Sequence, residues 1–236
     1  MVRFALLLWL PLIALACARD PAEREYYTAL QGEETGMGHE RQLEHLDRAI
    51  ALRPDREWYR ETHAIYSIDV HRFDTAAADL DTAIQLSDRP YLRFLRGLVQ
   101  CQRGEYESSL PDFDQAIAGQ PENSQFYRGR SLARSALGRY PEALEDARRL
   151  VQFVPQQGES HYALGVALAG LERYEEAVHA FDEAQRRRPE LVYPLRARAD
   201  AYERLGDRGR AEEDRAEVTR REAERPYDVS VDPFRY

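Results

Sequence analysis

Three kinds of residue return at multiples of 34 positions through the middle of this chain. They are Pro121, Pro155 and Pro189, then Tyr106, Tyr140 and Tyr174, and finally Gly104, Gly138 and Gly206. A period of this length is typical of stacked helical hairpins. Because each hairpin buries its apolar face only against its neighbours, the chain is predicted to be an all-α solenoid and not a single globule.

The fullest copy of the repeat spans residues 158–189. Gly165 and Ala177 are small where the two helices of a hairpin must approach each other, whereas Phe181 is large enough to fill the space between neighbouring hairpins. Pro189 ends the second helix, since proline lacks the N–H donor and clashes with the preceding turn. The residue types therefore fit a pair of closely packed antiparallel helices.

This pattern resembles the tetratricopeptide repeat (TPR), in which a Leu-Gly pair in the first helix is followed by Ala, Phe and a closing Pro in the second. The resemblance implies a right-handed α-solenoid of stacked antiparallel hairpins, with about five clear repeats and one degenerate amino-terminal hairpin. The expected segments are a degenerate repeat at 24–54, repeats at 57–88, 90–122, 124–156 and 158–190, a polar capping repeat at 192–225 and an extended tail at 226–236.

The first and last hairpins depart from the pattern. Gly32, Gly36 and Gly38 predict a longer, flexible turn inside the first hairpin. In the last hairpin Arg208 and Arg215 replace the usual aromatic residues, which is typical of a polar capping repeat. The tail after it is predicted either to pack on the end of the stack or to be offered to another protein.

The amino terminus has the features of an export signal. Residues 1–16 combine Arg3 with a continuous apolar stretch, which is too short for a membrane span. Ala14-Leu15-Ala16-Cys17 resembles the lipobox of bacterial lipoproteins, so Cys17 is predicted to carry lipid such as palmitate, followed by a tether at 17–23. Ala18 in place of Asp favours the outer membrane. The segment before Cys17 also fits an ordinary A-x-A cleavage site, which would give a secreted or soluble periplasmic protein.

Composition and motifs argue against several function classes. A net charge of -9 does not favour nucleic-acid binding. The six histidines show no H-E-x-x-H spacing, the two cysteines are far apart, and phosphate-binding glycine loops and nucleophile elbows are absent. We therefore predict a non-enzymatic protein without cofactor or metal. Cys101 is predicted to be a buried thiol and His161 a packing residue.

Acidic residues cluster in the second helices, for example at Glu142, Glu145 and Asp146. We interpret them as a solvated outer face with ion pairs one turn apart, such as Glu145 with Arg149 and Asp182 with Arg186. Calcium ligands are the alternative interpretation.

The resemblance implies that the inner face, built by the first helices, holds a peptide or helix of another protein. Aromatic and Arg side chains dominate binding hot spots, although the same aromatics can form the hairpin core. The candidate binding residues are Trp58, Tyr91, Phe94, Arg128, Tyr162, Tyr193 and Arg196. The carboxylate clamp of chaperone-binding TPR domains is not implied, because the chain has no Lys and its single Asn, Asn123, lies in a turn.

Two functional hypotheses follow. The first is a lipid-anchored scaffold on the periplasmic side of the cell envelope that docks another envelope protein, since lipoproteins of this kind assist outer-membrane assembly, pilus biogenesis or control of peptidoglycan hydrolases. The second is a soluble secreted scaffold that self-associates, with its inner face filled by its own tail.

Overall fold

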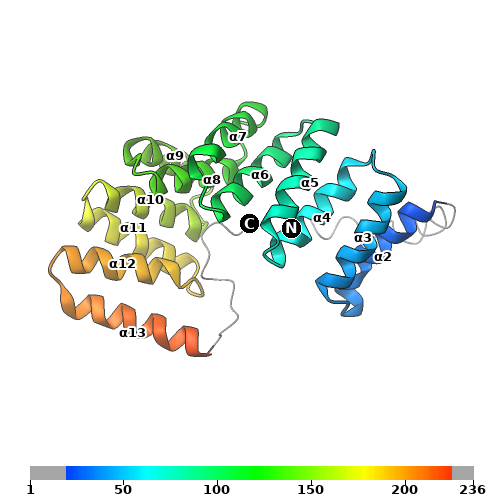
Figure 1. Ribbon diagram of the computed structural model, residues 1–236. Helices are drawn as coiled ribbons and strands as arrows, with labels where there is room; N and C mark the ends of the chain where they lie inside the picture. Colours follow the sequence, from blue (N-terminus) through cyan, green and yellow to red (C-terminus); the bar gives the residue numbers. More distant parts are fainter. Residues whose placement is uncertain (1–19, 225–236) are drawn as a thin grey trace. The chain divides into compact units, whose positions relative to one another are not determined.

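The protein is built from helical hairpins (Figure 1). The computed structural model describes residues 20–224, and no strand occurs among them. The helices are α2 (Pro21–Thr35), α3 (His39–Leu52), α4 (Glu57–Asp69), α5 (Phe73–Leu86), α6 (Pro90–Gln102), α7 (Tyr106–Gly119), α8 (Ser124–Ala136), α9 (Tyr140–Phe153), α10 (Gly158–Gly170), α11 (Tyr174–Arg187), α12 (Tyr193–Arg204) and α13 (Arg208–Glu224). The prediction of an all-α helical-repeat solenoid is confirmed. The predicted signal peptide, Cys17 and the tail at 226–236 lie outside the described residues.

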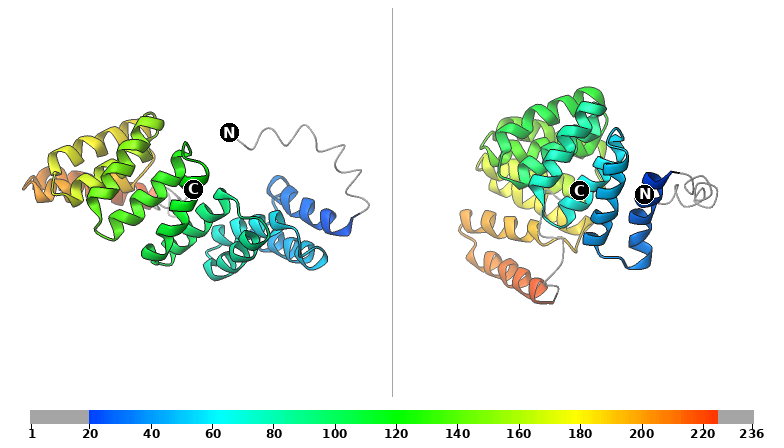
Figure 2. Two further views of the ribbon diagram at one scale, coloured as in Figure 1. Left: turned by 90° about the horizontal axis from the view of Figure 1, so that it is seen from above. Right: turned by 45° about the vertical axis from the view of Figure 1, so that its right-hand side comes forward.

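Each even-numbered helix and the helix after it form one hairpin, and we call them helix A and helix B. The chain divides into two compact units inside α6, the first ending at Leu92 and the second beginning at Arg93. Within each unit, helices that follow one another in the chain pack side by side, as Figure 1 and Figure 2 show. Inside each unit, successive hairpins thus share a core, as the 34-residue period predicts.

The recurring prolines lie directly beyond the ends of the B helices. Helices α7, α9 and α11 end at Gly119, Phe153 and Arg187, each two residues before a proline. The recurring glycines lie in the turns inside the hairpins, where Gly104, Gly138 and Gly206 have φ values of 77°, 72° and 79°. This left-handed conformation favours glycine because it has no Cβ. Both landmarks therefore end helices.

Two turns adopt the same backbone conformation without glycine. His71 and Glu172 both have a φ of 60°. Glu172 lies 34 residues after Gly138, at the equivalent point of the next hairpin. An L-residue in this region brings its Cβ close to the following carbonyl oxygen, so these two turns are strained where the glycine turns are not.

Close helix packing inside the hairpins depends on the small residues of helix A. A Cβ on Gly165 in α10 would lie 2.5 Å from the Phe181 ring in α11, and one on Gly97 in α6 would lie 2.8 Å from the Phe113 ring in α7. Both phenylalanines are fully buried. The predicted close approach of the two helices at Gly165 agrees with this packing, but the Phe181 ring, which was expected to fill the space between neighbouring hairpins, lies against Gly165 of its own hairpin.

The first hairpin differs from the prediction in two respects. Helix α2 begins at Pro21, inside the predicted tether, because the Asp20 side chain accepts a hydrogen bond of 3.0 Å from the Ala22 N–H and caps the helix. Gly32 lies within α2 and not in the turn, where a Cβ would come within 2.8 Å of the Gln42 side chain. Only Gly36, with a φ of 73°, and the two residues after it form the turn.

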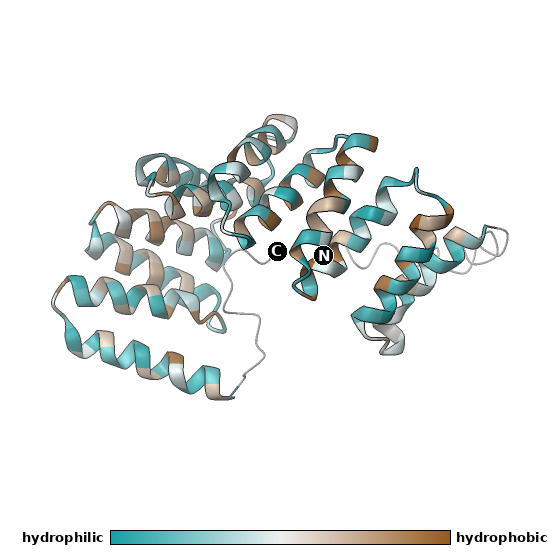
Figure 3. Ribbon diagram, in the orientation of Figure 1, coloured by the Kyte–Doolittle hydropathy of each residue, from teal (hydrophilic) through white to brown (hydrophobic). Residues whose placement is uncertain are grey.

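The last hairpin has the polar character expected of a cap. Figure 3 shows α13 mostly in the hydrophilic colour. Its buried apolar residues are Ala211, which packs in a core cluster with Ala201 and Tyr202 of α12, and Val218, which packs against Val192 and Leu195. Its other face carries ion pairs one turn apart, such as that of Arg220 with Glu217. Among residues 20–224, no helix is both long and apolar enough to cross a membrane.

Candidate peptide-binding face

Two tyrosines from successive A helices meet in the second unit. The ring centroids of Tyr162 in α10 and Tyr193 in α12 are 4.4 Å apart. The interplanar angle is 64°, which is an edge-to-face arrangement. Tyr162 also contacts the Phe181 ring, at 6.0 Å. Tyr193 is largely buried, whereas Tyr162 is half-buried. The aromatic pair therefore extends from the hairpin core to the surface of the A helices.

The charges of nearby side chains act on the phenol of Tyr193. Burial raises the pKa of this phenol, the charge of Glu159 raises it further, and the charges of Arg128 and Arg188 act in the opposite direction. Glu159 accepts a hydrogen bond of 2.8 Å from Arg188 through Oε1. Among the proposed binding residues, Tyr162 and Tyr193 are in ring contact, and the charge of Arg128 acts on Tyr193. We call these three residues and Arg196 the tyrosine face.

Arg196 lies one helical turn after Tyr193 on α12 and is exposed. Its guanidinium forms an ion pair with Glu222 of α13. The structure therefore places Arg196 at the edge of the tyrosine face, where its charge is already partly balanced.

Phe94 does not belong to a binding face, and the prediction for this residue is wrong. Its side chain is 0% exposed and packs against the rings of Phe126 at 5.0 Å and Phe113 at 6.2 Å. The helix A position that is open in other hairpins is here filled from both neighbouring helices. Phe94 is a core residue of α6.

Trp58 and Tyr91 belong to the first unit. Trp58 is 36% exposed, and the Arg56 guanidinium lies over its ring at 5.0 Å from the centroid. Tyr91 is half-buried, and burial followed by the charge of Glu61 raises its pKa. Trp58 is therefore the accessible aromatic of the pair.

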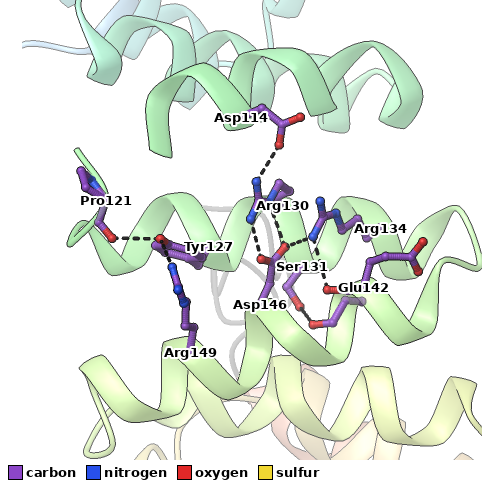
Figure 4. Close-up of polar contacts among 10 residues, drawn as sticks. Asp114, Pro121, Tyr127, Arg130, Ser131, Arg134, Glu142, Asp146 and Arg149 are labelled. Carbon is purple, nitrogen blue, oxygen red and sulfur yellow. Dashed lines mark hydrogen bonds and ion pairs between the residues drawn. The ribbon is translucent and has the colours of Figure 1, made fainter. Parts of the chain in front are cut away.

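A repeated ion pair, which we call the 16-residue pair, was missed in the sequence. In Figure 4, Arg130 of α8 donates to Asp146 of α9 from Nε at 2.9 Å and from Nη2 at 2.7 Å. Its remaining Nη1 donates to Asp114 of α7 at 2.6 Å. One guanidinium thus links helix B of its own hairpin to helix B of the preceding one. Burial lowers the pKa of Arg130, but the hydrogen bonds and charges of Asp146 and Asp114 outweigh it and raise the pKa overall.

The same geometry recurs in three other hairpins. Arg198 binds Asp214 through Nε and Nη2 at 2.8 and 2.6 Å and Asp182 through Nη1 at 2.5 Å. Arg96 binds Asp112 through Nε and Nη2. In the first unit His63 takes the place of the arginine, with Nδ1 2.5 Å from Asp79 and Nε2 3.3 Å from Asp47. Each partner lies 16 residues away along the chain.

The hairpin of α10 and α11 replaces this polar pair with Leu164 and Ala180. It is also the hairpin that matches the TPR pattern most fully. A search for Arg or His followed by Asp after 16 residues finds the pairs in the printed sequence. Arg93 and Arg96 of α6 occupy positions that are usually apolar in this repeat. Both pair with the buried Asp112, which explains why charged residues are accommodated there.

The predicted solvated acidic face needs correction. Only 4% of the Asp146 side chain is exposed, and its carboxylate also accepts a hydrogen bond of 2.8 Å from Arg134. Asp182 pairs with Arg198, while Arg186 pairs with Glu183. Arg149 donates to the Tyr127 hydroxyl at 3.0 Å. Asp146 is drawn toward α8 because a buried carboxylate requires several donors, and the two predicted pairs are replaced by other partners.

Two other side chains that could take part in catalysis, Cys101 and His161, have packing roles. Cys101 is buried and reduced, and burial raises the pKa of its thiol to about 12. His161 donates a hydrogen bond of 2.9 Å from Nε2 to the Pro155 carbonyl oxygen. Across residues 20–224, no three His, Cys, Asp or Glu side chains are grouped as metal ligands would be.

Comparison with known proteins finds a repeat family over part of the chain. Residues 94–158 and 137–191 match the tetratricopeptide repeat family. No curated protein sequence matches the chain. PilW, described as a widely conserved type IV pilus biogenesis factor, has a similar structure with a TM-score of 0.73, at 18% identity over 89% of this chain and 96% of PilW.

Two further solved structures are similar at the same identity of 18%. YrrB, described as a TPR protein with an unusual peptide-binding site, has a TM-score of 0.62 and covers 78% of this chain and 95% of its own. A MamA fragment from Desulfovibrio magneticus RS-1 has a TM-score of 0.60, and the match covers 72% of this chain and 96% of the fragment. At these identities the likeness concerns the fold. The tetratricopeptide repeat itself is matched over residues 94–191, and the fold of the described chain is similar to that of these repeat proteins.

Proposed function

We propose that this protein is a non-enzymatic interaction scaffold that docks a peptide or helix of an envelope protein on its tyrosine face. A lipid on Cys17 tethers it to the periplasmic side of the cell envelope, at the outer membrane. The observation that carries the proposal is the contact of Tyr162 with Tyr193 beside Arg128. The likeness to PilW and YrrB, whose descriptions name pilus biogenesis and a peptide-binding site, agrees with it.

The composition of the tyrosine face suits a protein partner. Tyrosine supplies a large contact area with only two side-chain torsions, and both tyrosine and arginine are enriched among the residues that carry most binding energy in interfaces. Tyr193 is already packed against Tyr162, so a partner would meet a preorganised aromatic surface and lose less entropy on binding. Arg128, Glu159 and Arg196 add charges of both signs at its border, which favour one register of the bound segment.

In the binding test, this protein captures its partner from detergent-solubilised native envelopes. Tyr162→Ala is expected to weaken binding by about 2 kcal/mol, which corresponds to roughly 30-fold in Kd, because a hot-spot aromatic is lost. Glu145→Ala, on the exposed surface of α9, is the matched control and is expected to bind normally. Unchanged affinity of a folded Tyr162→Ala protein, verified by circular dichroism, would exclude the tyrosine face.

The anchor is tested independently of the partner. Cells supplied with radiolabelled palmitate are expected to label the protein, and Cys17→Ala is expected to abolish the label. Cys101→Ala is the control and keeps it, since the Cys101 thiol is buried. Equal labelling of the Cys17→Ala protein, or no labelling of the unaltered chain, would remove the lipid anchor and leave the soluble scaffold.

A further inference from the structure

We propose that one edge of the first unit, formed by Leu52, Trp58 and Leu86, docks on the surface of the lipid bilayer. This inference depends on the proposed lipidation of Cys17. The three residues, which we call the apolar edge, expose 51%, 36% and 45% of their surface. They are three of the five exposed large hydrophobic residues in the described chain.

The three side chains lie at the same end of their helices. Leu52 and Leu86 are the last residues of α3 and α5, and they are 34 residues apart, at equivalent points of two successive hairpins. Trp58 is the second residue of α4, which packs against both of these helices. Since A and B helices are antiparallel, the ends of B helices and the beginnings of A helices form one edge.

The amino-terminal end of α2 lies on this edge too. Arg53, which follows α3, donates from Nη1 to Asp20, which caps α2, at 3.0 Å. Ala22, Ala49 and Tyr59 form a common buried cluster just inside it. The beginning of α2 is therefore held beside the end of α3 and the beginning of α4.

The distance from the anchor to the apolar edge is short. Three residues separate Cys17 from Pro21, where α2 begins. A fully extended chain advances at most about 3.6 Å per residue, so Cys17 lies within about 14 Å of Pro21. A lipid inserted in the membrane at Cys17 would keep the edge next to the bilayer, and this proximity raises its effective concentration there.

The chemistry of the apolar edge matches the interface of a bilayer. Tryptophan is enriched at the depth of the lipid headgroups, because it joins an apolar ring to a polar N–H. The neighbouring arginines are already paired, Arg53 with Asp20 and Arg89 with Glu61. Residues 20–92 also carry sixteen Asp and Glu against eight Arg. Attraction to anionic lipid is therefore not the driving force, and the edge fits a zwitterionic surface.

Trp58 itself provides the test. It is the only tryptophan after Cys17, since the other, Trp9, lies in the predicted signal peptide. The acylated full mature chain, purified from membranes, is reconstituted in phosphatidylcholine vesicles with brominated acyl chains. We expect the Trp58 emission to shift to shorter wavelength and to lose intensity relative to vesicles without bromine.

Variants separate the edge from the anchor. Replacing both leucines, in Leu52→Asp with Leu86→Asp, is expected to abolish the quenching while palmitate labelling persists. Phe153→Asp is the matched control, because Phe153 is the last residue of α9 in the second unit and is 41% exposed. It is expected to leave the quenching unchanged.

Three outcomes would overturn the inference. Labelled protein whose Trp58 is not quenched keeps its anchor but does not dock by this edge. An emission shift that follows protein concentration without vesicles would mean that a second copy covers the edge. If palmitate labelling fails, the proposed anchor is wrong. The apolar edge is then tested by itself, through Trp58 quenching in the Cys17→Ser protein with excess brominated vesicles. Absence of quenching in that experiment overturns the inference.

Discussion

At the scale of single residues, Asp146 explains how a polar network fits inside this fold. It accepts hydrogen bonds from Arg130 and from Arg134, and only 4% of its side chain is exposed. Burying a carboxylate is costly unless each oxygen has donors. Here the donors come from helix A of the same hairpin, so the pair also fixes how α8 and α9 pack.

Removing the carboxylate should therefore destabilise the protein strongly. Asp146→Ala is expected to lower the free energy of unfolding by about 3 kcal/mol, because Arg130 and Arg134 keep their charges without their buried partner. Urea denaturation measures the change, with the exposed Glu145→Ala expected to stay within about 0.5 kcal/mol. A loss below about 1 kcal/mol for Asp146→Ala would show that the pair contributes little.

The neighbouring hairpin supplies the rescue experiment. Arg130→Leu combined with Asp146→Ala reproduces Leu164 and Ala180 of α10 and α11. Apolar replacement of both members of a buried ion pair is often neutral. The double variant is expected to be more stable than Asp146→Ala alone in the same denaturation experiment. A double variant less stable than the single one would contradict this account of the pair.

Cys101 gives a prediction about pH. Burial raises the pKa of its thiol from the usual 9.0 to about 12. Below pH 9 the thiol is protonated in both folded and unfolded chains, so stability does not depend on it. Between pH 9 and 12 the unfolded chain loses this proton and the folded one keeps it. The free energy of unfolding should then fall, by up to about 1.4 kcal/mol per pH unit from this group.

The measurement compares the protein with Cys101→Ala, both in a Cys17→Ser background, by urea denaturation at pH 8 and pH 10. The stability difference between the two proteins should shift against the cysteine form at pH 10. Iodoacetamide should label Cys101 only after unfolding. Rapid labelling of the folded protein at pH 8 would contradict the burial of the thiol.

At the scale of helices and turns, local signals in the sequence predict most of the fold. The prolines after α7, α9 and α11 and the turn glycines mark helix ends because their backbone restrictions act locally. The start of α2 was predicted too late because Asp20 and Pro21 form a cap without any residue of the repeat pattern. Gly32 was placed in a turn because its contact with Gln42 comes from another helix.

The turn between α10 and α11 can be improved by one substitution. Glu172 has a φ of 60°, whereas the equivalent turn residue in the preceding hairpin is Gly138. The left-handed conformation costs an L-residue about 1–2 kcal/mol. Glycine avoids this cost, but it loses more conformational entropy on folding, which costs about 0.5–1 kcal/mol. Glu172→Gly is thus expected to stabilise the protein by about 0.5–1 kcal/mol, measured by thermal or urea unfolding.

The reciprocal change is the control for this turn. Gly138→Ala places a Cβ in the same conformation and is expected to destabilise the protein by about 1 kcal/mol. If Glu172→Gly lowered stability, the Glu172 side chain would have to contribute more than the backbone strain costs.

At the scale of the whole molecule, the sequence predicts the repeats better than the surface they present. Tyr162, Tyr193 and Arg128 were proposed as binding residues because aromatic and Arg residues recur in the A helices. Phe94 occupies a similar position but is enclosed by Phe113 and Phe126. A single sequence does not distinguish an aromatic that fills the core from one that remains accessible, because this depends on the side chains of neighbouring helices.

The polar pairs show the same limit on a larger scale. The 16-residue spacing is visible in the sequence, but acidic residues in helix B suit a solvated face equally well. Packing decides between the two, since Asp146 faces α8 and Glu145, the residue before it, is exposed. Arg130 and Arg198 each link their own hairpin to the preceding one, through Asp114 and Asp182.

The central claim is that a partner binds on the A helices of the second unit, and photo-cross-linking in the native envelope tests it most directly. A photoreactive amino acid is placed at Tyr162 in one protein and at Glu145 on the exposed surface of α9 in another. The account predicts that one discrete protein is cross-linked from position 162 and none from position 145. Equal cross-linking from both positions, or from position 145 alone, would contradict it.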